Sequence, residues 1–110
     1  MTIHVRRLPA YLYVMDCASG CKIGVSYSPS RRADQLNYQR PHMNFVPVFA
    51  LKFKERWDAF LAERVVRSFF KPFAVDGREI FDMPSLNAIE FIADNLVSRA
   101  AQDAESEDQS

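Results

Sequence analysis

Three polar side chains suited to phosphate recognition lie close together in the first third of the chain. Tyr13, Lys22 and Arg32 supply a hydroxyl, an ammonium and a guanidinium. All three donate hydrogen bonds, and the two cations attract an anion. Gly24 adds bare backbone beside them, which allows a ligand to approach closely. Gathered at one point, these groups could hold a phosphodiester.

Two short strands are expected to bring the first of these groups together. Residues 11–16 and 21–26 are rich in aromatic and β-branched types, and a short loop that ends in glycine joins them, as in a hairpin. Side chains alternate across a strand, so the aliphatic ones share one face. We expect that face to be the core. Tyr13, Lys22 and Gly24 would then lie on a common accessible face.

A helix is expected directly after the hairpin. Ser28 can cap its first amides and Pro29 suits its first position. The helix should end near residue 39, because a residue before proline avoids helical geometry. Helix N-termini attract phosphate, and the first turns carry two arginines. Candidate nucleic-acid contacts are Lys22, Arg31, Arg32, Arg40 and, from the following loop, His42, for which a plain surface position is the alternative.

The rest of the chain completes an α+β pattern. Residues 45–53 read as a third strand, in which Pro47 indicates an edge position or a bulge. Helices are expected at 55–70 and 85–100, with a short extended piece at 78–82. The first of these helices has an apolar stripe that we interpret as core: Trp57, Leu61, Val65 and Phe69, with Ala62 and Val66 beside them. The predicted fold is a small antiparallel three-stranded sheet flanked by helices, in the order β-β-α-β-α plus a C-terminal helix.

The bulk composition fits one intracellular domain. The chain has 110 residues, of which 48% are hydrophobic, enough for one core without disulfides. No apolar run approaches the roughly 20 residues of a membrane span, and the N-terminus has no signal-peptide stretch. We expect no membrane partner and a cytoplasmic location. The predicted division is an N-terminal extension at 1–9, the domain at 10–101 and an acidic disordered tail at 102–110.

Charge is distributed unevenly along the chain, although the formal net charge is zero. The tail holds four acids and no basic residue: Asp103, Glu105, Glu107 and Asp108. Residues 1–101 therefore keep all 14 basic residues against the 10 remaining acids, a net charge of +4. This asymmetry fits a phosphate-facing surface, but a charge of +4 is also ordinary for a globular domain.

The two cysteines, Cys17 and Cys21, do not indicate a zinc site. Such a site usually needs four ligands, and the two histidines are distant in the sequence. We interpret the cysteines as reduced thiols beside a turn. A half-site shared across a dimer is the alternative.

The order of these motifs resembles the GIY-YIG nuclease superfamily. The resemblance lies in the segment Tyr11-Leu12-Tyr13-Val14, in the step Lys22-Ile23-Gly24 and in Arg32 eight residues later. It is closest to the small phage and bacterial branch, which has a KIG step in place of YIG. Glu63 falls where the family has a glutamate on a later helix, and residues 77–81 resemble a further element. The resemblance covers residues 10–97.

The resemblance implies a metal-dependent endonuclease that hydrolyses phosphodiester bonds in DNA. Glu63 would hold a divalent metal, Mg2+ or Mn2+, and Arg32 would clamp the scissile phosphate. Tyr13 would orient or deprotonate the attacking water, with Lys22 supplying the positive charge that a phenolic base needs. Lys22 departs from the second tyrosine of the wider superfamily, so its role is not copied from there. Glu79 is an accessory candidate, as a second polar group or metal ligand.

Each candidate also has a purely structural explanation. Glu63 lies four residues before Arg67, so a helical ion pair would account for it. Two other functions compete with cleavage: a DNA-binding module that does not cut, and a protein-interaction domain suggested by the exposed aromatics and the acidic tail. A domain this small would cut loosely, act as a homodimer, or be targeted by a partner protein.

Overall fold

The fold begins with the expected hairpin. The computed structural model describes residues 9–75, 77 and 79–97. Strand β1 (Ala10–Cys17) pairs antiparallel with β2 (Gly20–Ser26), and Tyr13 lies directly opposite Gly24. The predicted tail at 102–110, and all of the predicted extension at 1–9 except its last residue, lie outside the described residues.

In the described part of the chain, five strands form the sheet, in contrast to the three that we expected. Its order is β3-β1-β2-β5-β4 and every pairing is antiparallel. Strand β3 (Val46–Phe53) is an edge strand, and its register against β1 shifts beside Pro47. Strands β4 (Ala74–Val75) and β5 (Ile80–Phe81) were not predicted as part of the sheet. Two residues are too few to show an alternating pattern.

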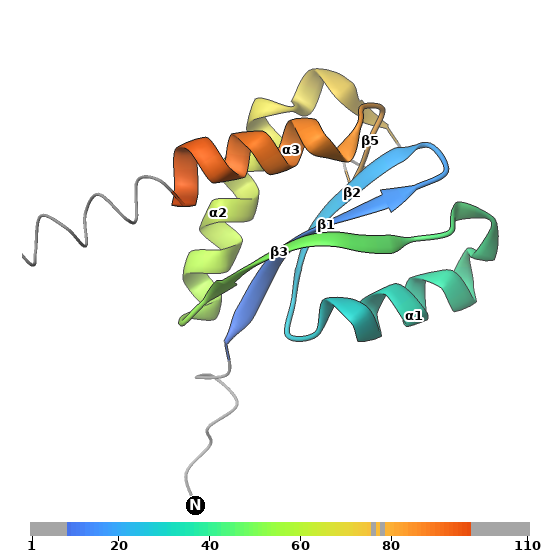
Figure 1. Cartoon of the computed structure of the whole chain (residues 1–110), viewed down its shortest axis with the longest axis horizontal. Coiled ribbons are helices and arrows are strands. Elements are labelled where there is room, and N and C mark those ends of the chain that lie inside the picture. The colour runs from blue at the N-terminus through green and yellow to red at the C-terminus, as the bar shows by residue number, and fades with distance from the viewer. Residues whose placement is uncertain (1–8, 76, 78, 98–110) are drawn as a thin grey trace, which may run out of the picture.

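Helices cover both faces of this sheet (Figure 1). Helix α1 (Pro29–Gln39) lies on one face, and α2 (Arg56–Phe69) and α3 (Ser85–Ile92) lie on the other. A short π-helical segment, Ala93–Val97, continues α3. The α+β class is therefore confirmed. Within the described residues, no helix is both long and apolar enough to cross a membrane.

Two hydrophobic clusters follow from this layering, one on each face of the sheet. The cluster under α2 and α3 contains Leu12, Val14, Ile23, Val66, Phe81 and Ile92 among others. The cluster under α1 contains Tyr13, Met15, Ala33, Leu36, Phe45 and Ile80. The expectation of one core face and one accessible face was therefore wrong. Because α1 packs apolar side chains on the second face, Tyr13 and Lys22 are buried there, at 2% and 3% exposure.

The apolar stripe predicted as the core of α2 is also wrong. Trp57, Leu61, Val65 and Phe69 are 70%, 43%, 50% and 60% exposed. The buried face of α2 is lined by Ala59, Ala62 and Val66. Small side chains let the helix backbone approach the sheet closely, and the larger ones are turned outward.

The ends of α1 lie close to where the sequence placed them. Pro29 opens the helix and Arg40 follows its last residue, as predicted. Ser28 occupies the N-cap position, but its side chain makes no capping hydrogen bond. Instead its N–H donates to Ser26 Oγ at 3.0 Å, which fixes the link between β2 and α1.

Candidate functional site

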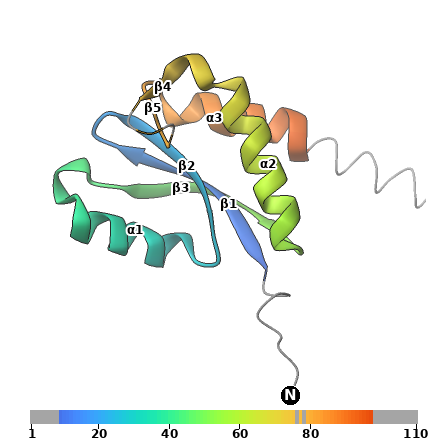
Figure 2. The ribbon, with the colours of Figure 1, turned by 180° about the vertical axis from the view of Figure 1, so that it is seen from behind.

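The site is built on the open edge of β2. Among the described residues, β5 pairs with β2 at Cys21 and Lys22, at one end of β2. Figure 2 shows β4 and β5 together at one end of β2, with α2 running alongside the sheet. The other end of β2, towards Ser26, has no further strand beside it among the described residues. Side chains from opposite faces of the sheet can therefore meet around this edge.

Tyr13 and Arg32 approach this edge from the α1 face. Arg32 lies in the first turns of α1, and its guanidinium lies close enough to the Tyr13 hydroxyl to act on the pKa of the phenol. The ring of Tyr13 lies over Gly24, so closely that a Cβ on Gly24 would overlap the phenol oxygen. Glycine at this position is therefore what admits the ring. Arg32 Nη1 also donates a hydrogen bond to Gln35 Oε1 at 3.4 Å.

Burial raises the pKa of the Tyr13 phenol above its ordinary value. The hydrogen bond and the charge of Arg32 act in the opposite direction, and the carboxylates of Glu79 and Glu63 add to the increase. The positive charge that opposes burial comes from Arg32, not from Lys22 as we had expected. Tyr13 is thus a neutral hydroxyl at ordinary pH, suited to orienting a water rather than to deprotonating it.

Glu63 reaches the site from α2, on the opposite face of the sheet. Its Oε1 lies 3.6 Å from Arg67 Nη1, so the predicted helical ion pair is confirmed. Burial raises the pKa of Glu63, whereas the charges of Arg67 and Lys22 lower it. The ionised carboxylate is therefore incompletely compensated by the protein, and an added cation would favour it.

Lys22 and Glu79 form a second ion pair beside Glu63. Lys22 Nζ donates to Glu79 Oε2 at 3.1 Å, with the lysine side chain 4% exposed and the glutamate side chain 59% exposed. The buried ammonium is fixed, and the carboxylate is the partner in contact with solvent. Glu79 also raises the pKa of Glu63 and of Tyr13, so all these groups share one electrostatic environment.

Two hollows flank these groups and share the Phe60 side chain. One, of about 500 Å³, is lined by Glu63 together with the cations Arg64, Arg67 and Lys71. The other, of about 250 Å³, is lined by Arg32, Arg56, Tyr27 and Ser26. Glu63 and Arg32 thus face neighbouring parts of one surface.

The cations on α2 were missed by the sequence reasoning. Arg56, Phe60, Arg64, Arg67 and Lys71 recur at helical spacing, so they share one face of α2 or its C-terminal extension. That spacing was a usable signal. The apolar side chains of the same helix recur with the same period, and the predicted core rested on them.

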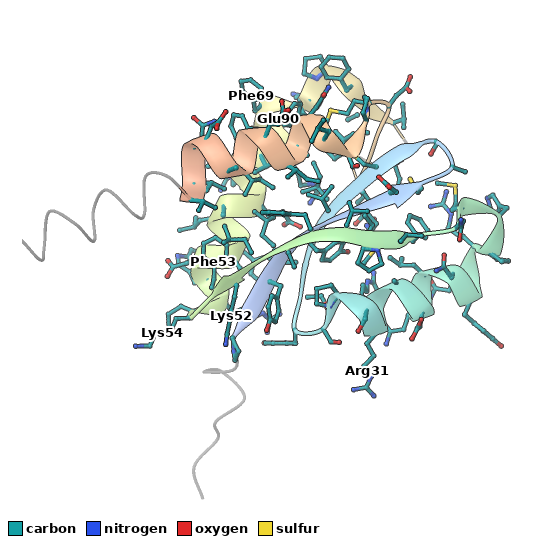
Figure 3. All side chains as sticks on the ribbon, in the orientation of Figure 1. Arg31, Lys52, Phe53, Lys54, Phe69 and Glu90 are labelled. Atoms are coloured by element: carbon teal, nitrogen blue, oxygen red, sulfur yellow. The ribbon has the colours of Figure 1, made fainter. Side chains whose placement is uncertain are left out.

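The structure does not bring all the predicted contacts to this site. Arg40 and His42 lie at the far end of α1 from Arg32, and His42 is exposed in a short 3-10 turn. Arg31 is exposed and points away from the sheet, as Figure 3 shows. Tyr13, Lys22, Arg32, Glu63 and Glu79 do come together.

The two cysteines take no part in this site. Both are free, which agrees with reduced thiols. Burial raises the pKa of the Cys21 thiol to about 12, so it is a poor nucleophile and a poor metal ligand at neutral pH.

The comparisons with known proteins identify one family and correct our reading of the motifs. The family model of the T5orf172 domain matches residues 10–97. This is a domain family different from GIY-YIG, so the resemblance to that superfamily was wrong. Motifs of three or four residues carry little information, whereas the family model tests almost the whole described chain. No curated protein and no solved structure matches the chain.

Proposed function

This chain belongs to the T5orf172 domain family, a family of nuclease-like and DNA-binding domains, and from that premise we propose that it is a metal-dependent endonuclease acting on DNA. A DNA-related function follows from the family. Cleavage is our proposal, and it is supported by the convergence of Tyr13, Arg32 and Glu63 on the open edge of β2.

The observation that carries the proposal is that groups of opposite charge lie on the two sides of this edge. Arg32 and the phenol of Tyr13 approach from α1, and the Glu63 carboxylate approaches from α2. The two hollows along this edge are together called the groove. A phosphodiester held by the planar guanidinium of Arg32 would place its oxygens towards the side of the groove that carries Glu63. A site with cations and no carboxylate would bind a phosphate but would have no ligand for a metal ion.

Within this site, the protein groups have distinct roles. Arg32 would bind a non-bridging phosphate oxygen and neutralise charge that develops during attack. Tyr13, kept neutral by burial, would orient the attacking water by a hydrogen bond. Lys22 would hold the local positive charge that keeps Glu63 ionised. Glu79 anchors Lys22 and is exposed enough to exchange that contact for a ligand.

The donor set fits a magnesium or manganese ion bound through one carboxylate. In the described part of the chain, no three His, Cys, Asp or Glu side chains gather as a metal cage. Mg2+ does not require one, since it commonly keeps several waters and binds one or two carboxylates together with substrate phosphates. Glu63 is the residue that would hold it. When bound, the ion would supply charge stabilisation at the phosphate and the leaving oxygen.

A DNA-binding module without cleavage is the second candidate. One observation favours it: both carboxylates near the groove already have cationic partners, Glu63 with Arg67 and Glu79 with Lys22. A site whose acids stay paired would bind the DNA backbone through its cations alone. The experiment below separates the two candidates.

We predict that Glu63→Gln abolishes cleavage and preserves DNA binding. Nicking of a supercoiled plasmid should require Mg2+ or Mn2+ and should fall at least about a hundredfold in this variant, since the ion loses its ligand. Glu90→Gln is the matched control, because Glu90 is exposed on α3 (Figure 3). The control should cut like the wild type.

The contrary outcomes are distinct. If Glu63→Gln nicks DNA as fast as the wild type, the metal site is assigned to the wrong residue. If the wild type never nicks DNA with either metal, yet binds DNA with an affinity that falls steeply with salt, the non-cleaving module is correct.

A further inference from the structure

The smaller hollow at the end of β2 is a different kind of site from the one at Glu63. Its described lining includes two arginines, Arg32 and Arg56, together with Tyr27 and Phe60, and no acidic side chain. The larger hollow contains a carboxylate. Two guanidinium groups without a carboxylate favour an anion, and the size of about 250 Å³ suits a sugar-phosphate unit rather than a whole protein segment.

Arg56 is held in place by its neighbours in this hollow. Its Nη1 donates a hydrogen bond to the Tyr27 hydroxyl at 3.0 Å. Its guanidinium carbon lies 5.4 Å from the centroid of the Tyr27 ring and 5.2 Å from that of the Phe60 ring. Contacts between a cation and an aromatic face stabilise such an arrangement. The side chain is therefore more ordered than a typical surface arginine, and an anion would bind it at a smaller entropic cost.

The donors of Arg56 are mostly available to a ligand. A guanidinium carries several N–H donors in a rigid planar fork. Within the described ranges, the Tyr27 hydroxyl is the hydrogen-bond acceptor that the structure provides for this side chain. No carboxylate there competes with an incoming phosphate. The fork remains free to make a two-point contact with phosphate oxygens.

We propose that Arg56, positioned by Tyr27 and Phe60, binds a second phosphate of the DNA strand whose neighbouring phosphate lies at Glu63 and Arg32. Arg32 lines the same hollow as Arg56, and Phe60 lines both this hollow and the one that contains Glu63. A strand that passes along the open edge of β2 would therefore place successive phosphates in the two hollows. This inference rests on the proposed DNA-binding function and adds a subsite to it.

The test compares DNA affinity at several salt concentrations. A fluorescently labelled duplex is titrated with full-length protein carrying Glu63→Gln, so that cleavage does not interfere, and anisotropy gives Kd. Arg56→Ala should weaken binding about tenfold at low salt and reduce the slope of log K against log salt by about 0.9, because one phosphate contact is lost. Circular dichroism checks that the variant folds, as expected for an exposed residue.

Two further variants test how Arg56 acts. Arg56→Lys keeps the charge but loses the planar fork, so the salt slope should stay and the affinity should fall to an intermediate value. Tyr27→Phe keeps the ring and removes the hydroxyl that holds the guanidinium. Its salt slope should also stay, with affinity lowered severalfold.

The control removes one exposed charge from another edge of the sheet. Lys52 lies on β3, the edge strand on the other side of β1 from β2 (Figure 3). Lys52→Ala should change affinity and slope much less than Arg56→Ala. Equal effects of the two variants, or an Arg56→Ala slope identical to that of its parent, would overturn the subsite while leaving plasmid nicking and its dependence on Glu63 intact. Absence of DNA binding in the wild type would overturn the proposed function as well.

Discussion

Gly24 determines where the Tyr13 phenol can lie. The ring occupies the space that a side chain at residue 24 would fill, because the two residues face each other across β1 and β2. The hydroxyl can then reach Arg32, which approaches from α1 on the same face of the sheet. A single missing Cβ is therefore a condition for the contact between phenol and guanidinium.

We predict that Gly24→Ala lowers the free energy of unfolding by about 1–3 kcal/mol, because it overpacks a buried position. Chemical denaturation would measure the loss. The double variant Gly24→Ala/Tyr13→Leu serves as the control, since replacing the tyrosine ring by the shorter leucine side chain removes the overlap. It should lose less stability than the sum of the two single changes. Strict additivity would show that the added methyl group and the ring do not collide.

At the level of single residues, the sequence allowed part of the site to be predicted. Tyr13, Lys22, Arg32 and Glu63 come together as expected, because strand alternation and helix starts are local properties of the sequence. The pairing of Lys22 with Glu79 joins residues far apart in the chain, and the sequence alone did not indicate it. The contact of Arg56 with Tyr27 was missed for the same reason, because Tyr27 lies in the link between β2 and α1, far from Arg56 in the chain.

At the level of elements, α2 presents three different faces. Ala59, Ala62 and Val66 are buried against the sheet. The cations and Glu63 line the groove, and a third face exposes the large apolar side chains from Trp57 to Phe69. Helical periodicity alone could not decide which apolar face is buried. The sheet favours the smaller residues because its close approach leaves little room for a tryptophan.

We predict that the small residues stabilise α2 more than the large ones. Val66 is 0% exposed, so Val66→Ala should cost about 2 kcal/mol of unfolding free energy through lost burial and a residual cavity. Trp57 is 70% exposed, so Trp57→Ala should cost less than about 1 kcal/mol, although it removes far more atoms. Urea denaturation of the two variants would measure both values. The reverse ranking would show that the stripe from Trp57 to Phe69 is the core of the helix.

At the level of the whole molecule, the α+β class was predictable and the layering was not. Amphipathic strands indicate which side chains share a face, but they do not show whether a helix covers the second face. Tyr13 and Met15 are apolar enough to be buried, and α1 supplies Ala33 and Leu36 to bury them. The additional strands β4 and β5 depend on the pairing of β5 with β2. The sequence of a two-residue segment does not predict such a tertiary contact.

Net charge also acts at this scale. The four acids between residues 102 and 110 balance a surplus of four positive charges in the rest of the chain. We predict that replacing all four acids by amides raises DNA affinity severalfold at about 50 mM salt, because the total charge becomes +4. Anisotropy titrations would measure the change. Because salt screens these charges, the effect should fade at high salt. Equal affinity at low salt would refute the prediction.

The open edge of β2 has a consequence for the chain during its synthesis. Tyr13 and Arg32 precede Glu63 in the chain, and the groove exists only once α2 has packed against the sheet face opposite α1. An incomplete chain therefore holds cations without the carboxylate. Such a fragment contains groups that attract nucleic acid and lacks the carboxylate to which we assign the metal. The proposed reaction therefore requires the chain to include α2.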